Sequence, residues 1–87
     1  MTPFEEEFRD KLLEHLGLED VVPGTITGDT YLFGEGLELD SIDAIEIEVL
    51  IKKTYGINIQ PSERSESTFG TFGKLTSFIQ ENRGRDA

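Results

Sequence analysis

The sequence contains no cysteine, so neither disulfide bonds nor a thiolate metal site can stabilise the fold. No run of apolar residues approaches the roughly 18 that a membrane-spanning helix needs. The segment from Met1 to Glu7 is acidic, whereas a secretory signal peptide begins with basic residues and continues with apolar ones. We therefore expect a cytoplasmic protein without a membrane span.

Basic residues are scarce, since 8 lysines and arginines stand against 18 acids and the formal net charge is -10. Residues 17–40 contain six acids and no base. A surface of this sign repels nucleic acid and anionic membranes, and it attracts basic patches on other proteins. We exclude nucleic-acid binding and expect protein partners.

Residues for catalysis are also few. His15 is the only histidine, and nothing in the spacing brings it to a serine for a Ser-His-Asp arrangement. The segment 29–34 begins and ends like a calcium loop but lacks oxygen ligands at its third and fifth positions. We expect no metal site and no enzymatic activity.

The length of 87 residues suits one domain, and apolar residues recur at helical spacing in three segments. Thr2 is a suitable N-cap for the first segment and Gly17 a suitable C-cap. The expected fold is all-α, a small bundle of three to four helices with a long first loop. Its expected parts are a helix over about 2–16, the loop 17–40, a helix over about 41–55, a short helical or irregular segment at 60–70, a helix over about 72–82 and a frayed tail at 83–87.

The second predicted helix carries two apolar stripes. One consists of Ile42, Ile45 and Val49, and the other of Ile47, Leu50 and Ile51. Because the stripes are adjacent, we expect this helix to be buried on a wide face at the centre of the bundle. Its N-cap is expected to be Asp40, which leaves the side chain of Ser41 free of capping.

The loop 17–40 is long for a compact domain, and loops of this length are usually functional. Its aliphatic and aromatic residues between Val21 and Leu39 are expected to hold it against the core. A β-hairpin over 25–31 is the alternative, because β-branched residues there flank a Gly-Asp turn.

The segment from Leu37 to Ile47 resembles the phosphopantetheine attachment motif of acyl carrier proteins. The core of that motif is Asp-Ser-Leu, and this chain has Asp40, Ser41 and Ile42. The resemblance extends to the layout of nearly the whole chain. It implies a 4'-phosphopantetheine arm, donated by coenzyme A and attached covalently to Ser41.

The resemblance also implies partners and the residues that meet them. The partners are a phosphopantetheinyl transferase and acyl-processing enzymes such as ketosynthases and acyltransferases, and the carrier is expected to be a monomer. Asp40, Asp43 and Glu46 match acids that meet basic patches on such enzymes, and Ile42 matches a partner-contacting leucine. For the acids, a capping or simply solvated role is the alternative interpretation.

Four positions fall where the family lines a pocket for the acyl chain: Phe33, Leu50, Ile51 and Ile59. Ordinary core packing explains these residues equally well. The chain departs from the family pattern at Lys52 and Lys53, where acids are usual, and at Glu48, where an apolar residue is common. We interpret these departures as signs of a specialised bacterial carrier for fatty-acid, lipid or polyketide-type synthesis.

Three other hypotheses stay open at this stage. A peptidyl or aminoacyl carrier would share the serine and the helical layout. An unmodified acidic module that docks basic proteins would share the charge. A hydrolase that uses Ser41 would need a base close to it.

Overall fold

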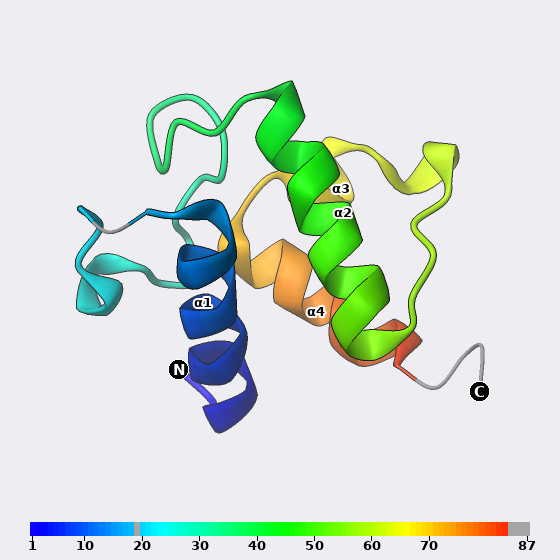
Figure 1. Ribbon diagram of the computed structural model, residues 1–87, viewed down its shortest axis with the longest axis horizontal. Coiled ribbons are helices and arrows are strands. Elements are labelled where there is room, and N and C mark those ends of the chain that lie inside the picture. The colour runs from blue at the N-terminus through cyan, green and yellow to red at the C-terminus, as the bar shows by residue number, and fades with distance from the viewer. Residues whose placement is uncertain (19, 84–87) are drawn as a thin grey trace.

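The computed structural model describes residues 1–18 and 20–83 (Figure 1). Within these residues the chain forms α1 (Pro3–Leu16), η1 (Pro23–Thr25), α2 (Ser41–Tyr55), η2 (Pro61–Glu63), α3 (Glu66–Phe69) and α4 (Phe72–Asn82), where η denotes a 3-10 turn. The described part contains no β-strand, only two isolated bridges. The predicted all-α class is therefore confirmed. The hairpin alternative is wrong, because Thr25 belongs to η1 and Tyr31 forms its isolated bridge with Thr71 and not with a residue across the Gly-Asp turn.

The first helix begins and ends as its sequence predicts. The hydroxyl of Thr2 accepts a hydrogen bond from the backbone N–H of Glu5, and the Glu5 carboxylate accepts one from the N–H of Thr2. This reciprocal pair satisfies two N–H groups that the helix cannot bond internally. At the other end Gly17 adopts the left-handed conformation, with φ of 67°, which glycine reaches without strain.

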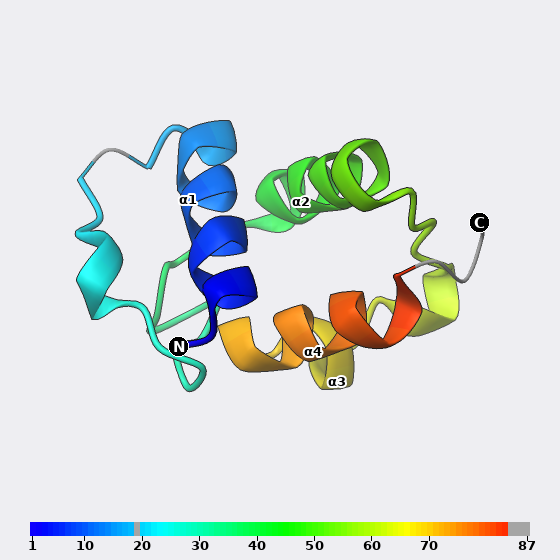
Figure 2. The same cartoon turned by 90° about the horizontal axis from the view of Figure 1, so that it is seen from below.

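One apolar core joins the helices and the long loop. Figure 2 shows α4 crossing below α2, with α1 beside both. The side chains that meet between them are fully buried and include Phe8, Leu12, Ile47, Ile51, Phe72, Leu75 and Ile79. Burial of this kind stabilises a small domain by about 1.5–3 kcal/mol for each large apolar side chain.

The expectation that α2 buries both of its apolar stripes is wrong. Ile42, Ile45 and Val49 are 67%, 60% and 49% exposed, whereas Ile47 and Ile51 have no exposed surface. The helix lies at the edge of the bundle (Figure 2). Because no described element covers the outer side, one stripe contacts the core and the other faces solvent.

The long loop is held by the first turn of α4. The backbone N–H groups of Phe72 and Gly73 donate to the carbonyls of Thr30 and Gly28 at 2.8 and 2.9 Å. Gly73 permits this approach, because a Cβ atom there would lie 2.7 Å from the Gly28 carbonyl oxygen. The glycine that weakens the helix by its propensity is thus required by the contact.

The C-terminal end of the described chain is packed. The Arg83 guanidinium lies over the rings of Phe4 and Tyr55, at 5.0 and 5.6 Å from their centres. Such cation–π contacts hold the residue in place, so the expectation of a frayed tail is wrong for Arg83. The rest of that expected tail, residues 84–87, lies outside the described residues. Burial raises the pKa of Tyr55, whose phenol lies beneath the guanidinium.

Candidate functional site

The first residue of α2 is Ser41, and its side chain is exposed. The cap is supplied by the preceding residue: Oδ1 of Asp40 accepts hydrogen bonds from the N–H groups of Ile42 and Asp43 at 3.0 and 2.9 Å. In return, the Asp43 carboxylate accepts from the N–H of Asp40 at 3.1 Å. The Ser41 hydroxyl makes no hydrogen bond to any described residue.

The chain just before the serine is held in one conformation. Leu39 is buried, and its N–H donates to the carbonyl of Leu32 at 3.0 Å. Glu38 adopts a left-handed conformation with φ of 56°, which is uncommon for a residue with a side chain. Such strain persists only where surrounding contacts fix the backbone, and it is frequent at functional sites. The serine is therefore displayed at a defined place.

The three acids predicted to recognise partner proteins also make hydrogen bonds within this chain. Asp40 and Asp43 form the capping box, and an oxygen of the Glu46 carboxylate lies 3.1 Å from Nε2 of His15 in a hydrogen bond. This contact joins α2 to the last turn of α1. The histidine therefore contacts Glu46, and no described base contacts Ser41, whereas a serine nucleophile is activated by an adjacent base.

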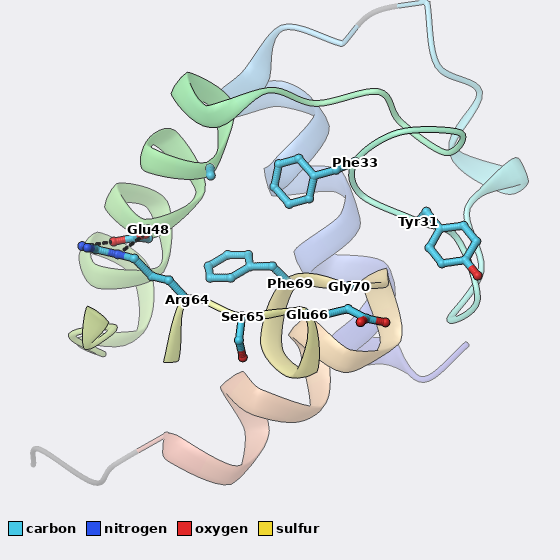
Figure 3. A pocket seen from close by; sticks show the side chains of 9 residues that line it. Tyr31, Phe33, Glu48, Arg64, Ser65, Glu66, Phe69 and Gly70 are labelled. Carbon is cyan, nitrogen blue, oxygen red and sulfur yellow. Dashed lines mark hydrogen bonds and ion pairs between the residues drawn. The ribbon is translucent and has the colours of Figure 1, made fainter. Parts of the chain in front are cut away.

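Two grooves border α2 beyond Ser41. The first, which we call the Ala44 groove, has a volume of about 510 Å³. Its lining includes Tyr31, Phe33, Ala44, Glu48, Arg64 and Phe69 (Figure 3). The second, the Ile59 groove, has a volume of about 390 Å³ and includes Glu48, Val49, Lys52, Ile57, Ile59 and Arg64.

The structure separates the four positions predicted for an acyl pocket. Phe33 lines the Ala44 groove, where it points towards Phe69 (Figure 3). Ile59 lines the Ile59 groove. Leu50 and Ile51 are buried in the core and line neither groove.

An ion pair stands where the two grooves meet. Nε and one terminal nitrogen of Arg64 donate to the two carboxylate oxygens of Glu48 at 2.8 and 2.9 Å. This two-point geometry is the strong form of the contact between an arginine and a carboxylate. The hydrogen bonds that Arg64 donates to Glu48, together with the negative charge of that carboxylate, raise the pKa of Arg64.

Sequence reasoning missed several residues of this region. Ala44, Phe69 and Arg64 were not singled out, and Ile45 and Val49 were expected inside. One signal was available: Glu48 lies between Ala44 and Ile51 at helical spacing, so a charge interrupts an inward-facing row. A charge in that place indicates either a partner or a polar boundary.

The chain was compared with proteins of known family. No protein-family model matches it. The acyl carrier protein of Aster yellows witches'-broom phytoplasma is 36% identical over 77 residues, which cover 88% of this chain and 93% of that one. The chain belongs to the acyl carrier protein family. It is also 35% identical over 80 residues to the polyketide-8 synthase acyl carrier protein 2 of Streptomyces avermitilis, with 90% and 87% of the two chains covered.

A solved acyl carrier protein has the same fold. The NMR structure of the holo acyl carrier protein of Nitrosomonas europaea superposes with a TM-score of 0.74 at 26% identity, covering 93% of this chain and 96% of that one. The family thus gives this chain an acyl carrier role. None of the described helices is long and apolar enough to cross a membrane. Residues 1–18 and 20–83 also contain no group of three acids or histidines arranged to hold a metal.

Proposed function

We propose that this acyl carrier protein holds acyl intermediates as thioesters on a 4'-phosphopantetheine arm attached to Oγ of Ser41. The observation that carries the proposal is the setting of the serine. Its side chain is exposed, does not serve as the helix N-cap and makes no hydrogen bond to the described residues. Asp40 takes the capping role that serine often has at a helix start. The holo state of the Nitrosomonas relative supports the same chemistry.

The residues present suit the arm. In the attachment step, Oγ of Ser41 forms a bond to the phosphorus of coenzyme A that bears the pantetheine. The anhydride bond breaks, adenosine 3',5'-bisphosphate leaves, and the hydroxyl proton passes to a base of the transferase. The positive end of the α2 dipole lies beside the resulting phosphodiester and stabilises its charge. When attached, the arm supplies the thiol that carries the acyl group.

The outer side of α2 is suited to the partner enzymes. Exposed Ile42, Ile45 and Val49 form an apolar stripe, with Asp40, Asp43 and Glu46 close by in the sequence. A partner with a basic patch beside an apolar hollow matches both properties, since charge steers the encounter and apolar contact holds it. Ketosynthases, acyltransferases and the transferase are the expected partners. Lys52 and Lys53 confine the acidic part of α2 to its first half, which suits a dedicated set of enzymes.

The inner side of α2 is suited to the cargo. The Ala44 groove begins one helical turn after Ser41, and Phe33 and Phe69 face each other within it (Figure 3). An acyl chain lying there exchanges water for aromatic and aliphatic surface. We propose this groove as the place where the bundle covers the chain.

Mass spectrometry after incubation with coenzyme A and a broad-specificity phosphopantetheinyl transferase tests the attachment. We expect the mass of one arm to be added to the native protein and to the Ser77→Ala control. Ser77 is an exposed serine on α4, so it matches Ser41 in type and exposure. The Ser41→Ala variant should gain nothing. Native protein that stays unmodified with every transferase tried would refute the carrier mechanism and leave an acidic interaction module.

A further inference from the structure

The ion pair between Glu48 and Arg64 divides the groove space that borders α2. Both residues line the Ala44 groove, and both line the Ile59 groove. Glu48 reaches in from α2, and Arg64 comes from the chain just before α3 (Figure 3). The pair is therefore a shared wall between two grooves that would otherwise follow one another.

The position of this ion pair limits the length of the acyl chain that the Ala44 groove can cover. Ala44 and Glu48 are four residues apart on α2, which is about 6 Å along the helix axis. A full-length fatty acyl chain measures about 15 Å, half of the roughly 30 Å hydrocarbon core of a bilayer. An acyl chain that enters beside Ala44 and lies along α2 meets the ion pair after about 6 Å, so the groove covers only a short chain in this direction.

The remaining side of the Ala44 groove gives no further cover. Tyr31 there is 55% exposed, and the side chain of Glu66 is 83% exposed. Apolar carbon atoms that pass between these two residues stay in contact with water. Cover for a longer chain lies only beyond the wall, beside Ile57 and Ile59.

The charges of the ion pair oppose the passage of an apolar acyl chain. The Glu48 side chain is only 17% exposed, and the arginine supplies its charge partner. An apolar chain that displaced the guanidinium would leave a largely covered carboxylate without its partner, which is unfavourable. A chain that stops at the wall disturbs neither charge.

We propose that the Glu48–Arg64 ion pair limits the acyl chain that this bundle covers to short lengths, of the butanoyl to hexanoyl class. The proposal rests on the carrier function proposed above. Opening the pair would join the two grooves and allow longer chains to be covered.

The test uses the full chain loaded at Ser41 with straight acyl-phosphopantetheine groups, from butanoyl through hexanoyl, octanoyl and decanoyl to dodecanoyl. The thermal midpoint of each is compared with that of the unacylated holo protein. Each covered methylene should raise the midpoint by at most about 3–6 °C. In the native protein we expect the rise to level off near hexanoyl.

Three variants test whether the Glu48–Arg64 ion pair causes the plateau in the thermal midpoint. In Arg64→Ala the rise should continue to decanoyl or dodecanoyl, because the wall is open. The charge-reversed pair, Glu48→Arg with Arg64→Glu, should restore the native plateau. Lys11→Ala changes the net charge as Arg64→Ala does but lies on α1, outside both grooves, so it should keep the native plateau. If Arg64→Ala proves unfolded, Glu48→Gln serves in its place.

Amide chemical shifts provide a second readout. Dodecanoyl loading should move the signals of Ile57 and Ile59 in Arg64→Ala and leave them in place in the native protein. The proposal is overturned if the native midpoint keeps rising through dodecanoyl, if no acyl group raises it, or if Arg64→Ala levels off at the native length. Mass spectrometry separates these results from failure of the carrier function, since a chain that accepts no arm never yields the loaded forms.

Discussion

The cap of α2 gives the sharpest prediction about the site, because Asp40 has two roles that substitution can separate. It accepts hydrogen bonds from the N–H groups of Ile42 and Asp43, and it is a proposed recognition acid. Asp40→Ala removes both roles. Asp40→Asn removes the charge and keeps the cap, since asparagine is as good an N-cap as aspartate.

The magnitude follows from the geometry. Loss of an N-cap side chain costs about 0.5–2 kcal/mol. Both donor groups lie at an exposed helix end, so water replaces part of the lost bonding, and we expect about 1 kcal/mol for Asp40→Ala. In a domain of this size that lowers the thermal midpoint by about 4–8 °C. Asp40→Asn should stay within about 0.5 kcal/mol of the native protein.

Two assays are needed on the same proteins. Thermal unfolding followed by circular dichroism measures the cap, and the rate of arm transfer to Ser41 measures recognition. We expect Asp40→Asn to keep its stability but to be modified more slowly at low ionic strength, with the difference shrinking as salt is added. Equal loss of stability in both variants would refute the capping argument. A native rate of arm transfer in Asp40→Asn would refute the role of its charge.

Three further outcomes follow from the fold. Backbone and side-chain hydrogen bonds from Thr2 lower the pKa of Glu5 below its ordinary value of 4.5, so its stabilisation is present above that pH and is lost as the pH falls through the lowered value. Urea midpoints of the native protein and Glu5→Gln should therefore differ at neutral pH and converge in acid; a constant difference would contradict this. Gly73→Ala should destabilise by about 1–3 kcal/mol because its Cβ atom meets the Gly28 carbonyl, although alanine is the better helix former; unchanged stability relative to the exposed Ser77→Ala would show that the contact yields. The thermal midpoint should rise with salt, because the net charge is -10 and residues 17–40 contain no base; a flat profile would refute the repulsion.

Local chemistry explains why the helix boundaries of this chain are readable from its sequence. Thr2, Gly17, Asp40 and Gly56 each act within three or four residues of their own position, and all four cap a helix as their residue types predict. The local setting of Ser41, at the first position of α2 after the Asp40 cap, was predicted for the same reason. Its cap and its freedom depend on neighbours in the chain.

The orientation of α2 depends on distant residues and was misjudged. Both apolar stripes have helical spacing, and periodicity alone does not distinguish the stripe that meets the core from the one that meets partners. Ile45 and Val49 are therefore exposed against expectation. The Glu48–Arg64 pair joins residues 16 apart, and its formation depends on how the segment before α3 returns to α2. No local pattern contains that information.

The attachment of the long loop to α4 has a consequence for how the protein is made. The carbonyls of Gly28 and Thr30 find their donors in Gly73 and Phe72, more than forty residues later in the chain. A nascent chain on the ribosome lacks those donors until residues 72 and 73 have emerged. Until then the loop before Ser41 lacks the hydrogen bonds that hold it against α4. We therefore expect the serine to reach its final setting, and to be recognised as a substrate, only after the first turn of α4 has left the ribosome.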